Sequence, residues 1–174
     1  TNYNYDGDKT YTDKYEVVAI DFSKATSLTT IDNQAAMSCS NISGVLDLSQ
    51  TKVETIGKNA FSGCTGLTGV ILPNCLKTLG NESDKSGSVF NGCSGLEFVH
   101  TADSEVGVVF DWPSSLEYIG KQCFQGCTGF PANTTVVIPE SVTYVGSEAF
   151  DETTPSISTI IVETDNPLTY DGGA

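Results

Sequence analysis

Apolar residues recur along the chain in blocks that resemble one another, and this recurrence predicts the architecture. One block, beginning at Val53, reads V-E-T-I-G-K-N-A-F-S-G-C, and a second, beginning at Leu116, reads L-E-Y-I-G-K-Q-C-F-Q-G-C. Three further copies, one with an insertion and one degenerate, follow the same pattern. The first apolar residues of the five copies are Leu28, Val53, Leu76, Leu116 and Val142. An internal period of this length is typical of proteins built from stacked, similar units.

The spacing of the copies predicts where the stack is interrupted. Successive copies begin 25, 23, 40 and 26 residues apart, so the base period is about 23 residues. The long step contains insertions of 6 and 11 residues, near 81–87 and 101–109. Both segments are polar or contain glycine, as is typical of surface loops on a repeat protein.

Each unit contains a second apolar element that reads as a short strand. Val70, Ile71 and Leu72 precede a proline, as do Val136, Val137 and Ile138. A run of β-branched residues that ends at proline is typical of a strand that stops where a hydrogen-bond donor is missing. Equivalent runs lie at Ile20–Ser23, Leu46–Ser49 and Ile157–Val162.

Two other features that recur in the units, a glycine and an Ala-Phe-x-x-Cys stretch, each predict a turn. A glycine follows the second apolar residue in four copies, which indicates a positive φ or a close backbone approach. A helical turn is expected at the Ala-Phe-x-x-Cys stretch. These four glycines are Gly57, Gly80, Gly120 and Gly146. Stacking the units would bury one apolar side of each and place Phe61, Phe90, Phe124 and Phe150 in a column.

The combined pattern L-x-x-L-x-L-P-x-x-L-x-x-I-G-x-x-A-F-x-x-C, seen from Leu67 to Phe90, resembles the BspA-like leucine-rich repeat family. The resemblance covers roughly residues 15–165. It implies a β-rich leucine-rich-repeat solenoid: a right-handed superhelix of short parallel strands with helical or 3-10 turns, in about five repeats. It also implies a bacterial cell-surface or secreted protein linked to adhesion or protein binding.

Three departures from the family pattern are visible. Ala36 replaces the core Phe, and Thr153 replaces the Cys. The third unit is lengthened, so its strand is Phe98–Thr101, Val108–Trp112 or a hairpin of both.

The domain boundaries follow from the same pattern. Residues 1–14 lack the repeat and are expected to form a lead-in or cap, whereas 15–174 form the leucine-rich-repeat domain. Residues 166–174 look like the start of another unit, which leaves open that the array continues beyond residue 174.

Charge narrows the classes of partner. The chain carries 8 Lys and Arg against 22 Asp and Glu, a net charge of −14 with a pI near 4.1. Such a surface repels phosphate backbones and anionic lipid, so we expect no nucleic-acid partner. Apolar runs fall short of the roughly 20 residues that span a bilayer, so no membrane insertion by this fragment is expected.

The cysteines and the one histidine are better explained by repeat register than by chemistry. Stacked cysteines are close enough for disulfides, but their parallel Cβ vectors oppose bonding, so buried thiols are the favoured interpretation over a disulfide or a metal site. The four equivalent cysteines are Cys39, Cys64, Cys93 and Cys127. Cys123 occupies an alanine position and is expected in the core, while Cys75 is expected to be exposed. His100 has no accompanying catalytic motif.

Two other chemical signals are weak. Asp6, Asp8 and Asp13 suggest calcium, but Tyr11 and Val17 stand where the EF-hand loop needs Gly and Glu, so a solvated acidic loop is favoured. No carboxylate spacing singles out a catalytic pair. We therefore expect no enzyme, no metal and no cofactor.

Surfaces are the more promising sites. Alternation along each strand predicts an outward row that is acidic at one end and apolar at the other. This row comprises Asp21, Asp47, Ile71, Asp111 or His100, Val137 and Ile161. Its apolar members are candidate binding residues, and the alternative is ordinary β-propensity on a solvated sheet.

A second ladder offers aromatic candidates. Thr30, Thr55, Thr78, Tyr118 and Tyr144 occupy one equivalent position in successive copies. Tyr118 and Tyr144 should be neighbours, forming an amphipathic surface suited to a protein or sugar ring. The alternative is packing between units without a ligand.

The sequence predicts a non-catalytic interaction module, and the resemblance implies a bacterial cell-surface or secreted protein that acts in adhesion or in protein or glycan binding. The partner would be a host or bacterial surface protein or glycan, recognised on the strand face or through the inserted loops. The alternative is a structural stalk or spacer that presents another domain of a longer surface protein.

Overall fold

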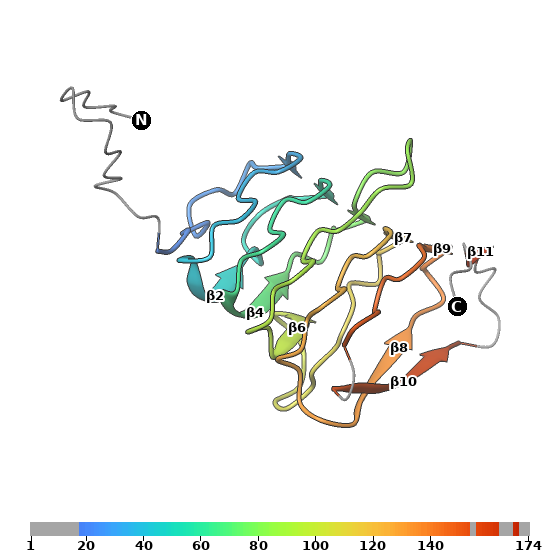
Figure 1. The fold of residues 1–174 in the computed structure, drawn as a ribbon. Coiled ribbons are helices and arrows are strands. Elements are labelled where there is room, and N and C mark those ends of the chain that lie inside the picture. Colours follow the sequence, from blue (N-terminus) through green and yellow to red (C-terminus); the bar gives the residue numbers. More distant parts are fainter. Residues whose placement is uncertain (1–17, 154–155, 164–168, 171–174) are drawn as a thin grey trace, which may run out of the picture.

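The computed structural model describes residues 18–153, 156–163 and 169–170, and in these segments every regular element is a β-strand (Figure 1). The strands of one kind have only two residues: β1 (Thr30–Ile31), β3 (Thr55–Ile56), β5 (Thr78–Leu79), β7 (Tyr118–Ile119), β9 (Tyr144–Val145) and β11 (Thr169–Tyr170). The others are longer: β2 (Ser43–Asp47), β4 (Gly66–Leu72), β6 (Phe98–Thr101), β8 (Thr134–Ile138) and β10 (Ile157–Val162).

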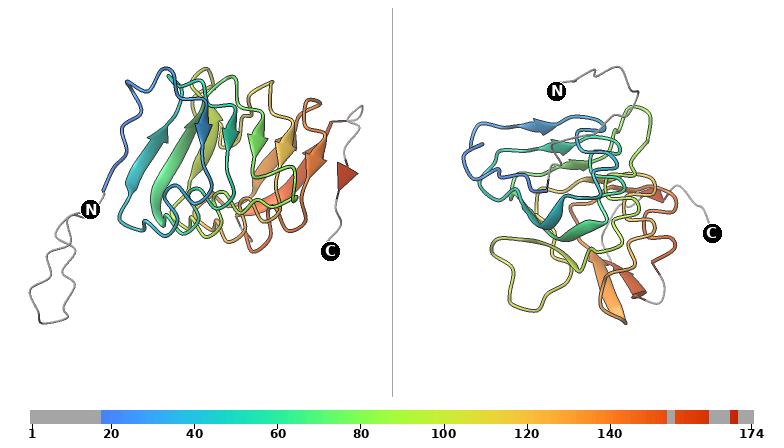
Figure 2. Two further views of the ribbon diagram at one scale, coloured as in Figure 1. Left: turned by 90° about the horizontal axis from the view of Figure 1, so that it is seen from above. Right: turned by 60° about the vertical axis from the view of Figure 1, so that its left-hand side comes forward.

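The two kinds of strand form separate parallel sheets on different sides of a solenoid of about five turns (Figures 1 and 2). The short strands make a six-stranded sheet in the order β1-β3-β5-β7-β9-β11. The longer strands make a sheet β2-β4-β6 and a pair β8-β10. Equivalent residues are paired, for example Ile31 with Ile56 and Ile56 with Leu79. The predicted solenoid of stacked parallel strands is confirmed.

The predicted column of phenylalanines runs through the core. The rings of Phe61 and Phe90 stack with centroids 5.7 Å apart, and those of Phe90 and Phe124 lie 5.5 Å apart. Phe150 continues the column at 5.5 Å from Phe124. Phe61, Phe90 and Phe124 are almost fully buried. Each such pair adds about 0.5–1.5 kcal/mol beyond the burial of its apolar area, so the column ties each turn of the solenoid to the next.

The Ala-Phe-x-x-Cys stretch forms turns in the described residues, and the helical turn expected there is not present. Its N–H groups alternate in direction. Ala60 N–H donates back to Gly57 O within its own turn, whereas Phe61 N–H donates to Val89 O of the next, at 2.9 Å. A helix would direct all of these donors along its own axis and leave the next turn of the solenoid without partners.

The alternation requires a left-handed residue at the same place in every turn of the solenoid. The residue two positions before the core Phe, or before Ala36 in the first turn, has φ between 55° and 59°. These residues are Gln34, Asn59, Ser88, Gln122 and Glu148. A non-glycine residue in this conformation costs roughly 1–2 kcal/mol. Hydrogen bonds between turns, such as Phe124 N to Ala149 O at 2.7 Å, offset that cost.

The repeated glycines serve mainly close approach of neighbouring turns. A Cβ on Gly146 would lie 2.3 Å from the backbone N of Lys121, and one on Gly57 would lie 2.7 Å from the N of Asn33. Gly80 differs, because its φ of +121° also favours glycine. Of the two reasons predicted from sequence, the close approach is the general one.

Three of the four equivalent cysteines are buried thiols that bond across turns, whereas Cys39 is half-buried and its thiol lies toward Met37 O of its own turn. Cys93 Sγ donates to Phe61 O at 3.1 Å, and Cys127 Sγ donates to Phe90 O at the same distance. Cys123 is fully buried, as predicted, whereas Cys75 is half-buried with its thiol toward Val53 O. Burial raises the pKa of Cys64 to about 11 and also raises the pKa of Cys93, Cys123 and Cys127.

The second insertion returns the chain to the same sheet. The strand of the lengthened unit is Phe98–Thr101, and Val99 then forms a parallel bridge with Phe110. Parallel pairing shows that a hairpin of both segments was the wrong alternative. Phe110 packs at 4.7 Å from Phe130 and edge-on to Phe124, so the insertion is anchored in the core.

Some sequence expectations lie in part or wholly outside the described residues. They are the lead-in at 1–14, the acidic loop of Asp6, Asp8 and Asp13, and the partial unit at 166–174. Ile20–Ser23 is described but forms no strand. Ile20 and Phe22 nevertheless pack against the core.

Gly146→Ala tests the close approach of turns. The added Cβ must displace the backbone of Lys121, so we expect a loss of about 1–3 kcal/mol in the free energy of unfolding by urea, as for overpacked interiors. Ser147→Ala is the matched control and should change the midpoint little. An unchanged midpoint for Gly146→Ala would show that the turns are not in close contact there.

Thiol reactivity tests the cysteine column. Because thiolate is the reactive form, Cys64, Cys93, Cys123 and Cys127 should resist Ellman's reagent at pH 8, while the half-buried Cys39 and Cys75 react. Peptide mass spectrometry after brief labelling identifies the modified residues, and Cys75→Ser should remove one of the two rapid reactions. Rapid labelling of Cys93 or Cys127 in the folded protein would contradict this packing.

Candidate binding surfaces

The outward row predicted from strand alternation is present on the longer strands. Asp47 pairs with Ile71, and Ile71 pairs with His100. On the other pair of strands Val137 is in register with Ile161. On β4 and β8 the neighbours in sequence, such as Val70 and Val136, are fully buried, whereas on β10 the two neighbours of Ile161, Ile160 and Val162, are 49% and 41% exposed. Burial therefore alternates as predicted around Ile71 and Val137 but not around Ile161, and the role of all three residues in binding stays a prediction.

The apolar end of this row is open to solvent. Val137 is 42% exposed and Ile161 is 47% exposed. Ile71 is only half-exposed and is in register with His100, whose ring stacks on Phe98 at 4.5 Å. The name apolar strand patch is used below for Val137 and Ile161 together. Two adjacent β-branched residues at this exposure form a small apolar contact area on a fixed backbone.

The second inserted loop projects beside the same face. Ser104 Oγ donates to Asp111 at 2.6 Å and Ser104 also contacts Thr101, so both ends of the loop are tied together. Val106 is fully exposed at its tip. Loops held at both ends on a rigid scaffold commonly contribute to recognition.

The two tyrosines lie where the ladder predicted but are covered. Tyr118 and Tyr144 stack face to face, with centroids 4.6 Å apart. They are only 6% and 8% exposed. The first inserted loop lies against them: Asn81 O accepts a hydrogen bond from Tyr118 Oη at 3.4 Å, and Lys85 Nζ lies 5.6 Å from the Tyr144 ring. An open aromatic surface, as expected from sequence, is therefore not available.

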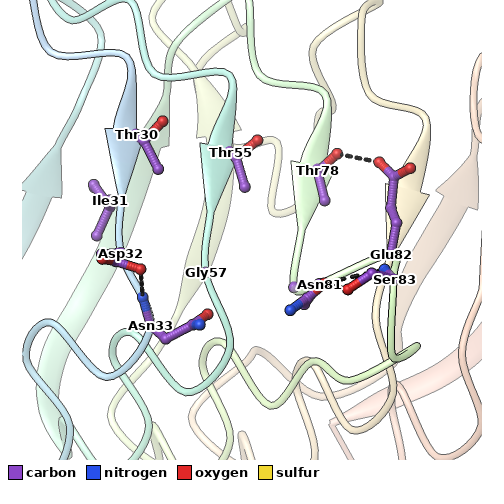
Figure 3. A pocket seen from close by; sticks show the side chains of 11 residues that line it. Thr30, Ile31, Asp32, Asn33, Thr55, Gly57, Thr78, Asn81, Glu82 and Ser83 are labelled. Carbon is purple, nitrogen blue, oxygen red and sulfur yellow. Dashed lines mark hydrogen bonds between the residues drawn. The ribbon is translucent and has the colours of Figure 1, made fainter.

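The same loop creates a hollow on the other side, over β1, β3 and β5. This threonine hollow has a volume of about 370 Å³ (Figure 3). Its lining residues are Thr30, Ile31, Asp32, Asn33, Thr55, Gly57, Thr78, Gly80, Asn81, Glu82 and Ser83. Three paired threonines form its floor, with hydroxyls that point the same way in Figure 3.

Hydrogen bonds hold the two walls of the threonine hollow. On one wall, Asn33 Oδ1 accepts from Lys58 N at 2.8 Å. On the other, Asn81 Oδ1 accepts from Ser83 N at 3.0 Å, and Glu82 accepts from the Thr78 hydroxyl at 2.6 Å. Each wall thus carries one carboxylate beside one amide whose orientation is fixed.

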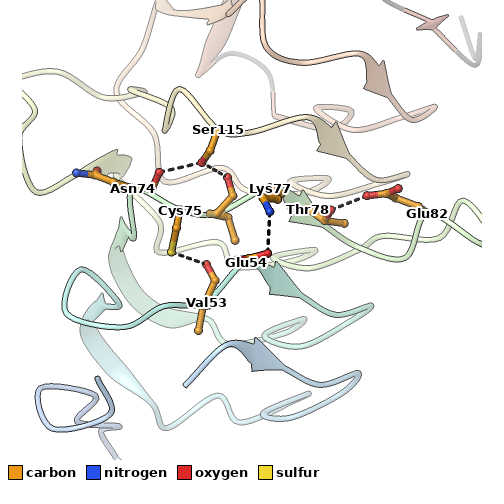
Figure 4. Close-up of polar contacts among 9 residues, drawn as sticks. Val53, Glu54, Asn74, Cys75, Lys77, Thr78, Glu82 and Ser115 are labelled. Carbon is orange, nitrogen blue, oxygen red and sulfur yellow. Dashed lines mark hydrogen bonds and ion pairs between the residues drawn. The ribbon is translucent and has the colours of Figure 1, made fainter. Parts of the chain in front are cut away.

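Further polar contacts join the segments that lead into β3, β5 and β7 (Figure 4). Lys77 Nζ lies 2.8 Å from Glu54 Oε2, an ion pair between half-exposed side chains of successive turns. The Ser115 hydroxyl lies 2.6 Å from Leu76 O. These contacts repeat the pattern of the core, in which each turn of the solenoid bonds to its neighbour.

Among the residues that the structure describes, those suited to chemistry are not assembled as a reaction centre. His100 Nδ1 lies 2.8 Å from Thr101 O rather than beside a nucleophile. Within the described segments, no group of three or more His, Cys, Asp or Glu side chains is placed to hold a metal ion. Those segments also contain no helix long and apolar enough to cross a bilayer.

The strand row was predictable from the sequence, whereas the threonine hollow was not predicted. The threonine ladder was visible, and Asn81-Glu82-Ser83 follows Gly80 directly, which was the available signal. Sequence did not show that the loop would fold over the tyrosines and leave the threonines open.

Comparison with known proteins agrees with this architecture. The family model described as BspA type leucine rich repeat region matches residues 7–106 and 108–170 in six copies. The chain is similar to a leucine-rich repeat protein from Bacteroides ovatus, with 27% identity over 77% of this chain and a TM-score of 0.59. It also shares its fold with a leucine-rich repeat protein of T. pallidum, with 17% identity over 82% of this chain and a TM-score of 0.55.

The two solved structures are longer than the matched region. The alignment covers 29% of the Bacteroides chain and 66% of the Treponema chain. A comparison with curated proteins gives no significant match. The match to the family model spans most of the sequence, and the signature it describes is the one that positions the core. The chain belongs to the BspA-type leucine-rich repeat family.

Proposed function

We propose that this chain is a non-catalytic interaction module of an exported or surface-displayed bacterial protein, and that it binds a partner protein through the apolar strand patch. The observation that carries the proposal is the pair Val137 and Ile161, which stand side by side in register and are nearly half exposed. Repeat proteins of this type typically act through extended faces of the stack.

The scaffold favours recognition because the apolar strand patch loses little conformational entropy when a partner binds. Val137 and Ile161 belong to strands with five paired positions between them, and Trp112 Nε1 donates to Val137 O at 2.9 Å. Their backbones are therefore fixed before a partner arrives. Binding to a pre-ordered surface avoids the entropy loss that a flexible loop would incur.

Charge indicates the character of the partner. The outward row is acidic at Asp47 and apolar at Val137 and Ile161, and the chain carries a net charge of −14. A partner surface with an apolar centre and basic flanks complements this arrangement. The surface location is supported by the family, whose members are typically surface-associated in bacteria.

The double substitution Val137→Ser and Ile161→Ser tests the proposal. The immobilised 174-residue chain is screened against purified extracellular-matrix and serum proteins by biolayer interferometry, and each binder is then measured with the variant. Loss of two apolar contacts should weaken binding at least tenfold, since each such contact contributes roughly 1 kcal/mol or more. The melting temperature should change little because both side chains face solvent.

Val45→Ser is the matched control, because Val45 is 46% exposed on β2, which belongs to a different sheet from β8 and β10. It should leave binding unchanged. Equal loss in the control and the double variant, or binders that ignore the double variant, would reject the patch. A chain that binds none of the proteins would favour the structural spacer instead.

A further inference from the structure

We propose that the threonine hollow binds a neutral sugar residue of a glycan. The hollow lies on the sheet of short strands, away from the apolar strand patch on β8 and β10, so it constitutes a second site. The inference rests on the proposed function only in that the chain is a binding module. Its volume of about 370 Å³ falls at the lower end of the 300–1,000 Å³ typical of small-molecule sites.

Free polar groups in the hollow match a ligand that both donates and accepts hydrogen bonds. The hydroxyls of Thr30 and Thr55 bond to no other described residue, whereas that of Thr78 is held by Glu82. Each free hydroxyl offers one donor and two acceptor positions. Their Cα atoms are paired across adjacent strands, so the two hydroxyls lie roughly 5 Å apart, the usual spacing of parallel strands.

The walls add complementary pairs on opposite sides. Asn33 and Asn81 use their side-chain oxygens in internal hydrogen bonds, which leaves their NH₂ groups as donors. Asp32 and Glu82 keep carboxylate oxygens as acceptors. An amide donor beside a carboxylate acceptor suits two neighbouring hydroxyls of a sugar ring, each of which can accept one hydrogen bond and donate another.

Charge excludes acidic sugars and phosphorylated ligands. Two carboxylates line the hollow, none of the lining residues is cationic, and the chain as a whole is strongly acidic. A sulfated or carboxylated sugar would meet unfavourable potential on both walls. A simple cation would use the carboxylates but leave the amide NH₂ groups without acceptors. A neutral polyhydroxyl ligand uses both kinds of group.

The hollow is shaped in advance but open, which sets the expected affinity. Its floor is fixed by strand register and its walls by the bonds of Asn33, Asn81 and Glu82. No aromatic face is open to stack on the sugar, because the tyrosines lie under the loop. We therefore expect a dissociation constant in the millimolar range for one sugar residue, with higher avidity for repeated glycans.

The test uses the whole chain, ¹⁵N-labelled, titrated by NMR with the methyl glycosides of glucose, galactose, mannose and N-acetylglucosamine up to 50 mM. Spermidine and calcium chloride are titrated in parallel as cationic probes. At least one glycoside should shift the backbone amides of Thr30, Asn33, Thr55 and Glu82 in a saturable manner. The amides of Val137 and Ile161 should not move.

Two variants make the assignment specific. Thr55→Val keeps the β-branched shape but removes a hydroxyl, and Glu82→Gln keeps the size but removes an acceptor charge; each should weaken binding roughly fivefold, the value of one hydrogen bond. Thr135→Val, at an exposed position of β8, is the matched control and should not change the affinity.

The proposal is overturned if none of the four glycosides shifts these amides by 50 mM, if only spermidine or calcium does so, or if Thr55→Val and Thr135→Val bind the glycoside equally well. Protein binding that still depends on Val137 and Ile161 would then show that the proposed function stands while this site does not. The reverse pattern would reject the apolar strand patch and retain the sugar site.

Discussion

Each turn of this solenoid satisfies the backbone of its neighbour, and the rest of the structure depends on that constraint. At the phenylalanine turn, N–H groups point alternately into their own turn and toward the next, as Ala60 and Phe61 do. The alternation requires a left-handed residue before each core aromatic, even where that residue is Asn, Gln or Glu. It also brings backbones so close that glycine is required at Gly57 and Gly146. The aromatic column and the cysteine thiols then fill the space between the turns.

The repeat made much of the fold predictable. One period fixed which residues lie over one another, so the phenylalanine column, the outward row and the buried Cys123 followed without further information. The turn at Ala-Phe-x-x-Cys was mispredicted because the apolar spacing also suits a helical turn. Which carbonyl receives each N–H depends on the neighbouring turn, and a single unit does not contain that information.

The positions of the insertions in the sequence were predictable, but the paths of the inserted loops were not. The six-residue insertion near 81–87 was located by counting, yet its path depends on Tyr118, Tyr144 and Lys85 meeting in three dimensions. Because the loop covers the tyrosines, the threonines are the accessible residues of the ladder. The longer insertion likewise depends on Phe110 reaching Phe130 and Phe124. The candidate surfaces therefore combine a regular ladder, readable from sequence, with irregular loops that are not.

Hydrogen exchange with Phe90→Leu tests the mutual dependence of turns most directly. Phe90 stacks between Phe61 and Phe124, and its N–H donates to Cys123 O. The account predicts faster amide exchange in peptides spanning 87–92. Exchange should also be faster in those spanning 59–63 and 121–126, because each of these turns is hydrogen-bonded to the turn that contains Phe90. Faster exchange confined to 87–92, with both neighbours as protected as in the parent chain, would contradict it.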